Sequence, residues 1–336
     1  MRSSLALTAA LGFLPATAAH GEEPRPAARP KAVTPVQAYG KIRVCGTQLC
    51  SASGRPVQLR GMSSHGTQWF AHCLTGRAMD ALAYDWKASV VRVATYVRRG
   101  GYQADPKKFT DIVHKVIERA SARGLYVVVD WHTTQPGDPN EDFSDAKRFF
   151  QEIAQRHKHR TNVIYEIANE PNHVSWSRIK SYAEKLIPVI RSHDPDSVIL
   201  VPTPAWSTFS GSEHSDERTV VGNPVAAKNI MYTFHFYARA APKVFMDILD
   251  RASSKVPVFV TEWGIASWTG YGSDIPKAQK WIDLMAEKNI SWTNWSFSDN
   301  DREHSVFKKD TCGAGTFTRS DALTPNGAWI RERIRG

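Results

Sequence analysis

The chain has 336 residues, of which 42% are hydrophobic, and its 43 Lys and Arg outnumber its 33 Asp and Glu to give a formal net charge of +10. This size and composition suit one large globular domain such as an α/β barrel. The basic residues are scattered, with no long run and no nucleic-acid-binding motif, so no nucleic-acid partner is expected. A soluble basic surface, or adsorption to an acidic polysaccharide, accounts for the charge.

The first 19 residues are predicted to be a signal peptide. Arg2 precedes an apolar run from Leu5 to Leu14 that is too short to span a bilayer, and residues 16–18 form an A-x-A cleavage pattern. No other stretch approaches transmembrane length, so we expect a secreted protein, extracellular or periplasmic, with no membrane partner. Residues 20–35 contain four Pro and are predicted to form a disordered linker, which leaves 36–336 as the folded domain.

Eight short β-rich runs alternate with helical stretches along this domain. The strand candidates are residues 58–62, 90–93, 126–130, 163–167, 198–201, 230–234, 258–261 and 291–294. The helical patterns cover residues 105–124, 144–156, 176–192, 242–253 and 275–288. This alternation predicts a parallel sheet, and eight strands predict a single-domain (β/α)8 TIM barrel. The alternative is an open doubly wound sheet, but it would be expected to carry a Gly-rich turn after an early strand, and no GxGxxG motif is present.

The four Cys of an exported chain suggest disulfides. Cys45 and Cys50 flank residues 46–49, a sequence typical of a hairpin connection, so a short N-terminal hairpin with a cross-strand bridge is plausible. This leaves Cys73 and Cys312. The sequence has no CxxC pair and no HExxH motif, so no metal site is predicted.

Residues able to bind or react lie in or just after all eight strand candidates. The carboxyl ends of barrel strands meet at one face, where the functional groups of such proteins lie. In chain order these residues are His65, Trp69, Arg92, Tyr96, His132, Asn169, Glu170, Trp206, His235, Tyr237, Glu262 and Trp295. Trp131 and Trp263 stand in similar motifs but are expected to pack, and Asp130 is expected to support its neighbours rather than react.

Glu170 and Glu262 are the two carboxylates that stand out. They follow the fourth and seventh strand candidates, so they could face each other across a barrel mouth. Cleavage of a glycosidic bond needs one carboxylic acid to protonate the leaving oxygen and a second carboxylate to attack the anomeric carbon or to activate water. A covalent, retaining mechanism requires the two groups to be about 5 to 5.5 Å apart.

Seven stretches together resemble glycoside hydrolase family 5, in its bacterial-type endo-β-1,4-glucanase (cellulase) branch. They match in order and at barrel spacing from about Tyr39 to the end of the chain. The stretches are residues 59–66 (LRGMSSHG), 91–93 (VRV), 129–132 (VDWH), 169–171 (NEP), 235–237 (HFY), 261–264 (TEWG) and 294–296 (NWS).

The resemblance implies chemical roles for five of the residues. Glu170 would be the general acid/base and Glu262 the nucleophile. Arg92 would keep Glu262 ionised, because a nearby cation favours the charged carboxylate, and Tyr237 would donate a hydrogen bond to it. Asn169 would donate to the 2-hydroxyl of the sugar, a contact that strengthens in the transition state.

The resemblance also implies a binding cleft around these groups. His132 and His235 would line the site of the sugar at the cleaved bond, and Trp295 would form the platform beneath it. The further cleft candidates are His65, Trp69, Tyr96 and Trp206.

Two features at the barrel seam follow from the same resemblance. Cys73 and Cys312 would meet in a disulfide, since they follow the first and last strands, which are neighbours in a closed barrel. Asn300 stands near a position where relatives often place a Lys that contacts a second sugar.

The resulting prediction is a secreted, monomeric, retaining endo-β-1,4-glucanase that acts on cellulose or a related β-glucan without a cofactor. The same machinery could act on chitosan, mannan or xylan, and the basic surface argues somewhat against cationic chitosan. A sugar-binding barrel that has lost catalysis is disfavoured because both Glu are present.

Overall fold

The structure, a computed structural model, describes residues 33–336. The predicted signal peptide and most of the predicted linker therefore lie outside the described residues. Pro35 opens helix α1 (Pro35–Tyr39), and the Thr34 hydroxyl caps it by accepting a hydrogen bond from the Gln37 N–H at 3.3 Å. Thr34 and Pro35 thus belong to the folded domain rather than to the linker, because Thr followed by Pro is a helix-start signal.

A two-stranded antiparallel hairpin follows α1, as predicted. Its strands are β1 (Arg43–Cys45) and β2 (Gln48–Cys50), and a disulfide joins Cys45 to Cys50. Gly46 has φ 62° in the connecting turn, a backbone conformation that glycine adopts without a steric penalty.

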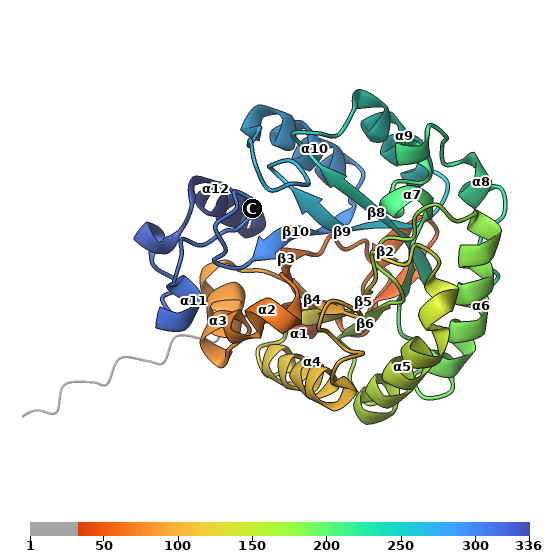
Figure 1. The fold of residues 1–336 in the computed structure, drawn as a ribbon, viewed down its shortest axis with the longest axis horizontal. Helices are drawn as coiled ribbons and strands as arrows, with labels where there is room; N and C mark the ends of the chain where they lie inside the picture. Colours follow the sequence, from red (N-terminus) through yellow and green to blue (C-terminus); the bar gives the residue numbers. More distant parts are fainter. Residues whose placement is uncertain (1–32) are drawn as a thin grey trace, which may run out of the picture. The chain divides into compact units, whose positions relative to one another are not determined.

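Eight parallel strands form a closed barrel in which β10 pairs with β3, which confirms the predicted fold class (Figure 1). The strands are β3 (Arg60–Ser64), β4 (Val90–Tyr96), β5 (Tyr126–His132), β6 (Val163–Glu166), β7 (Ile199–Val201), β8 (Ile230–Tyr237), β9 (Val258–Gly264) and β10 (Ser291–Phe297). The sheet therefore has no free edge.

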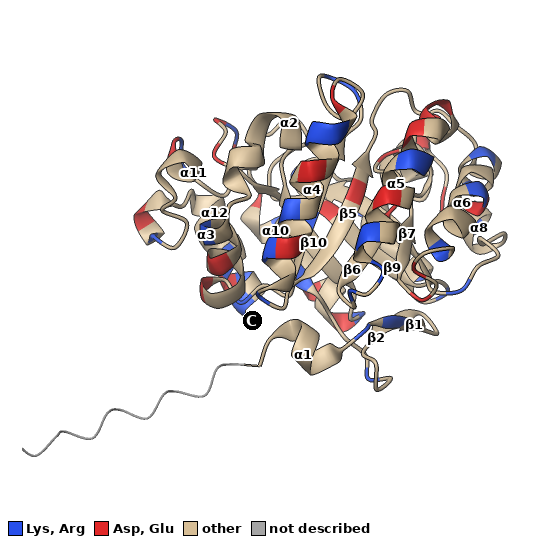
Figure 2. Ribbon diagram, turned by 90° about the horizontal axis from the view of Figure 1, so that it is seen from below, with Lys and Arg blue, Asp and Glu red and all other residues tan. Residues whose placement is uncertain are grey.

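Five long helices occupy the predicted positions between strands. They are α4 (Pro106–Ser121), α5 (Phe143–His157), α6 (Trp176–Arg191), α9 (Lys243–Ser253) and α10 (Ile275–Glu287). In α4, Asp105 caps the start, and Phe109, Val113 and Val116 belong to the buried face. Charged residues are coloured along the same helix in Figure 2. An apolar stripe that faces the barrel explains why each of these helices forms where it does.

Besides α1, six further α-helices within residues 33–336 are not predicted from the sequence patterns. One is the C-terminal helix, and the other five are a single turn long. They are α2 (Thr67–Phe70), α3 (Gly76–Asp80), α7 (Pro204–Ser207), α8 (Arg218–Val221), α11 (Thr311–Ala314) and α12 (Pro325–Arg335).

The hairpin and α1 close one end of the barrel. Figure 2 shows them at the end opposite α2, which follows the carboxyl end of β3. Ile42 and Leu49 pack into the same buried cluster as Val90 and Tyr126, which begin β4 and β5. The amino-terminal end of the barrel is thus filled by apolar side chains, and the carboxyl ends of the strands remain available for a site.

A second disulfide joins Cys73 to Cys312, whose Cα atoms lie 4.8 Å apart across a sequence separation of 239 residues. Cys73 follows β3 and Cys312 lies in α11 beyond β10, so the bridge fastens the two sides of the barrel seam. Both disulfides therefore pair as predicted.

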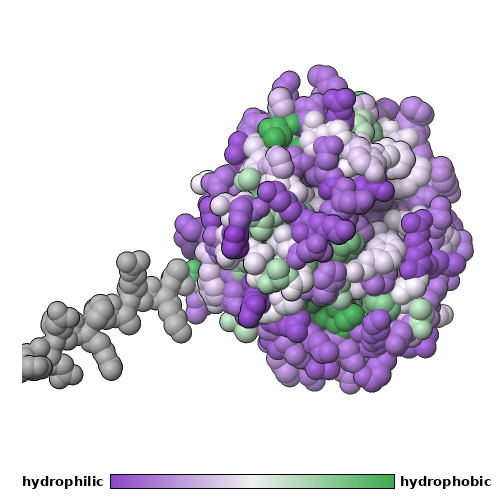
Figure 3. Space-filling model, turned by 60° about the vertical axis from the view of Figure 1, so that its left-hand side comes forward, coloured by the Kyte–Doolittle hydropathy of each residue, from purple (hydrophilic) through white to green (hydrophobic). Residues whose placement is uncertain are grey.

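Within residues 33–336, no helix has the length and apolar character needed to cross a membrane. On the face drawn in Figure 3, hydrophilic side chains cover most of the surface and hydrophobic ones form small separate patches.

Candidate active site

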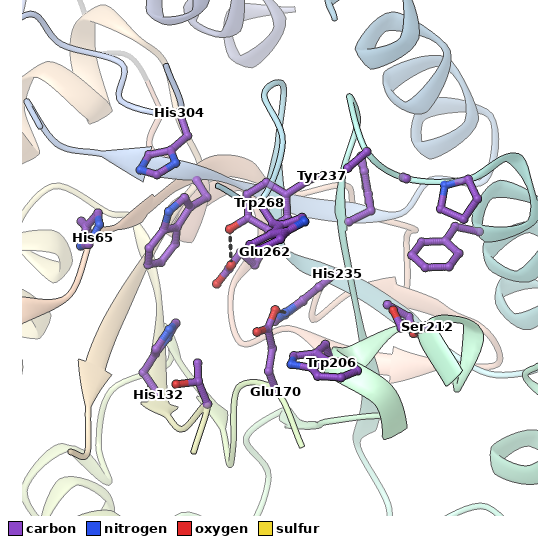
Figure 4. A pocket seen from close by; sticks show the side chains of 18 of the residues that line it. His65, His132, Glu170, Trp206, Ser212, His235, Tyr237, Glu262, Trp268 and His304 are labelled. Atoms are coloured by element: carbon purple, nitrogen blue, oxygen red, sulfur yellow. Dashed lines mark hydrogen bonds and ion pairs between the residues drawn. The ribbon is translucent and has the colours of Figure 1, made fainter. Parts of the chain in front are cut away.

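A pocket of about 670 Å³ lies at the carboxyl ends of the barrel strands (Figure 4). Nine of the predicted site residues line it. They are His65, Tyr96, His132, Glu170, Trp206, His235, Tyr237, Glu262 and Trp295. Side chains from all eight barrel strands or the loops after them therefore converge on one space, as expected for residues at the carboxyl ends of barrel strands.

The carboxyl groups of Glu170 and Glu262 point into the same part of this pocket (Figure 4). An oxygen of each lies within 4.8 Å of the other and of a ring nitrogen of His235. Glu262 is 4% exposed, and its two oxygens accept hydrogen bonds from the Tyr237 hydroxyl at 2.6 Å and from Arg92 at 3.1 Å. Both neighbours are donors, so they fix the orientation of this carboxyl group in the pocket.

Arg92 is completely buried beneath the pocket among three carboxylates. Its guanidinium lies 3.0 Å from Asp130, 2.6 Å from Glu166 and 3.1 Å from Glu262. Burial alone would lower the pKa of Arg92, but these carboxylates raise it above its ordinary value. In turn, although burial would raise the pKa of Glu166, the charge of Arg92 holds that pKa well below its usual range. Arg92 is thus a permanent cation that balances the acidic groups of the barrel interior.

His235 contacts Glu170 through one ring nitrogen and the barrel interior through the other. Its Nδ1 lies 3.0 Å from Glu170 Oε1, and its Nε2 lies 2.8 Å from the Thr261 hydroxyl. Because Thr261 donates its own proton to Glu166 at 2.7 Å, Nε2 must carry the hydrogen that it shares with Thr261. Burial would lower the pKa of His235, but the neighbouring carboxylates of Glu166 and Glu170 raise it to about 9. At neutral pH one proton is therefore held between His235 and Glu170.

His132 presents a neutral ring to the pocket. Burial, followed by the charge of Arg92, lowers the pKa of His132 to about 3. Its Nδ1 lies 2.6 Å from Asp130, so the neutral ring donates there and leaves Nε2 free to accept. Asp130 therefore orients His132 and pairs with Arg92, in keeping with its predicted supporting role.

Asn169 lies behind the pocket wall rather than on it. The residue is 1% exposed, its carboxamide oxygen accepts from Arg92 at 2.6 Å, and its nitrogen approaches the Thr133 carbonyl at 3.4 Å. This arrangement fixes the side chain next to Glu170, and its contact with a sugar hydroxyl stays a prediction.

Aromatic side chains form one wall of the pocket. The Trp295 ring lies 5.0 Å from the ring of His65 and 5.5 Å from that of His132, and Tyr96 stacks on His132 at 4.1 Å. Trp69 is 45% exposed and contacts Tyr96 and His65, but it does not line the pocket itself. The structure thus places Trp69 outside the pocket, as an extension of this wall.

A left-handed turn carries Trp206 on the opposite side, beside Glu170 (Figure 4). Ala205, Trp206 and Ser207 have φ of 58°, 58° and 55°, which costs on the order of 1 to 2 kcal/mol per non-glycine residue. The Trp206 N–H donates to the Pro171 carbonyl at 2.9 Å, and the Ser207 hydroxyl donates to the Asn169 carbonyl at 2.7 Å. These bonds join the loop of Trp206 to the loop of Glu170, so the two side chains keep a fixed relation.

Several residues of the site are not predicted by their position at a strand end, and three of them bear on its chemistry or shape. Glu166 lies within β6, where it pairs with Arg92. The sequence signal for it is an acidic residue inside an apolar strand, because a buried carboxylate needs a buried cation as its partner. Trp268 and His304 line the pocket from positions well inside the loops after β9 and β10. No motif marks those positions in the sequence.

Trp131 and Trp263 are fully buried, as expected of packing residues. Asn300 lines no part of the main pocket; its side-chain oxygen accepts from the Arg302 N–H at 2.8 Å and from the Ser305 hydroxyl at 2.5 Å. Asn300 therefore shapes the loop after β10.

Glu170, His235 and Glu262 lie close enough together to hold a cation. However, the raised pKa of His235 means that its Nδ1 shares a proton with Glu170 and offers no free lone pair at neutral pH. The arrangement is therefore better suited to proton transfer than to metal binding.

A closed barrel with two facing carboxylates in a pocket walled by aromatic rings defines the class of barrel glycosidases. Comparison with known proteins agrees, since the family model described as Cellulase (glycosyl hydrolase family 5) matches residues 50–301. The chain belongs to this family.

Several characterised relatives are bacterial endoglucanases. The chain is 53% identical over 313 residues to Endoglucanase E-5 of Thermobifida fusca, 47% identical over 306 residues to Endoglucanase MaCel5A of a Microbulbifer species, and 45% identical over 301 residues to Endoglucanase CelA of Streptomyces lividans. These matches cover 93%, 90% and 90% of this chain but 67%, 59% and 65% of the relatives, so the chain spans about three fifths to two thirds of their length.

A solved structure of the catalytic domain of the Thermobifida fusca endoglucanase, a variant in complex with cellotetraose, superposes with a TM-score of 0.89 at 53% identity. The match covers 90% of this chain and 100% of that domain.

Proposed function

We propose that this protein is a retaining endo-β-1,4-glucanase. The observation that carries the proposal is the approach of Glu170 and Glu262 to within 4.8 Å across one pocket. Retaining glycosidases keep their carboxyl groups about 5 to 5.5 Å apart, whereas inverting enzymes need about 6.5 to 9.5 Å to admit a water molecule between the carboxylate and the sugar.

In the first step, Glu262 bonds to the anomeric carbon while the glycosidic C–O bond breaks. Tyr237 and Arg92 hold Glu262 in place as a carboxylate before the attack. The proton shared by Glu170 and His235 passes to the leaving oxygen through Glu170, so the departing sugar leaves as an alcohol.

In the second step, water replaces the enzyme at the anomeric carbon. Ester formation removes the charge of Glu262, and Glu170, now deprotonated, takes a proton from the attacking water. The new C–O bond forms as the ester bond to Glu262 breaks. Two inversions at the same carbon give net retention.

The relatives and the aromatic walls support β-1,4-glucan as the substrate class. The three relatives described above carry the name endoglucanase, and Trp295 and Trp206 present rings on two sides of the carboxylates. Sugar rings expose apolar C–H faces that pack on such rings. A product profile on soluble β-glucans, mannan, xylan and chitosan tests this assignment, and we expect cello-oligosaccharides from the glucans as the main products.

Replacing Glu170 tests the catalytic proposal most simply. We expect Glu170→Gln to lower activity on carboxymethyl-cellulose at least a hundredfold, because Gln keeps the shape but cannot transfer the proton. Glu118→Gln, a matched change on the outer face of α4, should leave activity unchanged. Equal activity of Glu170→Gln and the unaltered protein would remove Glu170 from the mechanism.

We also propose that the protein is secreted and acts as a monomer. The leader-like N-terminus and two disulfides support export to an oxidising compartment, and a single chain supplies all of the site residues described. Sequencing the N-terminus of protein collected from the medium or periplasm tests export; an intact Met1 would argue against it.

A further inference from the structure

Trp268 is the most exposed of the eleven Trp, at 72%. It nevertheless lines the active-site pocket together with Glu262 and Tyr237 (Figure 4). Among residues 33–336, no other aromatic ring packs against its indole. A single exposed apolar ring needs no explanation by itself, but a ring on the wall of the pocket that holds Glu170 and Glu262 points to a ligand.

The loop that carries Trp268 is folded on itself. The Ser267 N–H and hydroxyl both donate to the Tyr271 carbonyl, at 3.1 and 2.7 Å, and the Gly270 N–H donates to the Ser267 carbonyl at 2.9 Å. Gly270 has φ 84°, a conformation that closes the turn, and a Cβ there would come within 2.7 Å of the His304 ring. Trp268 therefore stands at the tip of a compact turn rather than on a free loop.

Glu303, from the loop after β10, braces this turn from the side. Its carboxylate accepts from the Gly272 N–H at 3.1 Å and from both the N–H and the hydroxyl of Ser273, at 2.9 and 2.6 Å. Its own N–H donates to the Gly270 carbonyl at 2.8 Å. The hydrogen bonds from Ser273 and Gly272 lower the pKa of Glu303, so the brace persists in mildly acidic solution.

We propose that Trp268 is a sugar-binding platform, held ready by Glu303, that adds a stacking contact for one glucosyl unit of the substrate. The inference rests on the proposed function, since it names a specificity-determining residue of the same site. A ring fixed before binding loses little conformational freedom when the sugar arrives, which is why a braced turn suits this purpose.

Binding of cellotetraose to the Glu170→Gln variant, in which hydrolysis is suppressed, tests the platform. We expect the additional change Trp268→Ala to raise the Kd about tenfold, equivalent to about 1.4 kcal/mol, and Trp268→Phe to stay within about threefold. Tyr84→Ala removes an aromatic ring that is 63% exposed and lies outside the pocket, and it should leave binding unchanged.

A Kd unchanged by Trp268→Ala would overturn the platform assignment while leaving the proposed function intact. Failure of Glu170→Gln to bind cellotetraose at all would instead contradict the proposed function, and with it this inference. Because Trp268 is so exposed, the melting temperature should not change in either Trp268 variant.

A double-mutant cycle tests Glu303 as a positioning residue. We expect Glu303→Ala alone to raise the Kd about threefold, and to add less than twofold when Trp268 is already Ala, because its effect acts through that ring. Glu287→Ala, at an exposed end of α10, is the matched control and should change nothing. Multiplicative effects of the Glu303 and Trp268 changes would show that Glu303 does not act through the platform.

Discussion

Arg92 and His235 show how single side chains decide what the two glutamates can do. Arg92 is paired with three carboxyl groups, only one of which would react, so removing it would leave Glu166 as an uncompensated buried charge. His235 links Glu166 in the barrel interior to Glu170 in the pocket. The acid/base therefore depends on a histidine that keeps its proton.

The pH dependence of activity follows from this pair. The pKa of His235 is raised to about 9, so the shared proton is present below that pH and is lost as pH rises through it. We expect kcat/KM on cello-oligosaccharides to fall on the alkaline side near this value. In His235→Gln, which cannot hold the proton, the alkaline fall should move to lower pH and kcat/KM at pH 7 should drop at least tenfold.

Comparison of pH profiles from pH 5 to 10 measures this effect. His159→Gln, an exposed histidine after α5, is the control and should follow the unaltered profile. If His235→Gln keeps the original alkaline fall, the shared-proton account is wrong.

The site residues that could be predicted from the sequence are those that lie at the ends of strands. Glu170, Glu262 and His235 lie in or directly after strands, so the barrel prediction alone brings them together. Trp268 and His304 could not be predicted, because their positions depend on how the two long loops fold against each other. The brace by Glu303 that fixes these loops is a tertiary contact with no periodic signature.

At the scale of elements, long periodic segments were predictable and short ones were not. An apolar stripe in α4 or an apolar run in β5 is visible in sequence, whereas a four-residue helix such as α8 is too short to show a helical period. The ends of strands were also missed: β8 continues to Tyr237 instead of stopping at residue 234. Polar residues at the carboxyl ends of barrel strands resemble loop residues in the sequence. Pairing with the neighbouring strand in the closed barrel nevertheless extends β8 through them.

Helices α4 and α5 are joined by a buried pair of histidines. His114 Nδ1 lies 2.9 Å from His157 Nε2, and the outer nitrogens of the two rings face Glu152 at 3.4 Å and the Arg160 donor at 3.1 Å. Arg160 donates to Nδ1 of His157, so His157 donates through Nε2 to Nδ1 of His114, and His114 donates through Nε2 to Glu152. This row of hydrogen bonds requires both rings to be neutral. Asp111 of α4 and Arg156 of α5 are the other charges near the pair.

This pair should make stability depend on pH. Burial, followed by the charges of His114 and Arg160, lowers the pKa of His157 to about 3, whereas an unfolded histidine titrates near about 6.5. Below about pH 6.5 the unfolded chain binds more protons, so the free energy of unfolding falls as pH falls. We expect the melting temperature of His157→Gln, which preserves both hydrogen bonds but cannot titrate, to decline less between pH 7 and pH 4.

Thermal denaturation across this pH range measures the difference. His159→Gln, two residues further on and exposed, should retain the full decline. Parallel curves for His157→Gln and the unaltered protein would show that the pair does not carry the dependence.

At the scale of the whole molecule, the barrel is held closed both by strand pairing and by a covalent link. The last strand, β10, pairs with the first, β3, and the disulfide between Cys73 and Cys312 joins the segments that follow them. This link spans nearly the entire folded chain, whereas the disulfide between Cys45 and Cys50 closes a separation of 5 residues.

The two disulfides should therefore differ in their effect on stability. Replacing both Cys73 and Cys312 by Ser should lower the free energy of unfolding by about 2 to 5 kcal/mol, because the closed loop is long. The same replacement of Cys45 and Cys50 should cost less. Guanidinium denaturation of both double variants measures this order, and a larger loss from the hairpin pair would contradict it.

The division of labour between Glu170 and Glu262 is tested most directly by azide rescue with an aryl β-cellobioside that has a good leaving group. Azide should replace the missing carboxylate in Glu262→Ala and give an α-glycosyl azide after a single inversion. In Glu170→Ala it should intercept the glycosyl-enzyme and give the β-glycosyl azide. The same anomer from both variants, or the reverse assignment, would contradict the proposed roles of the two residues.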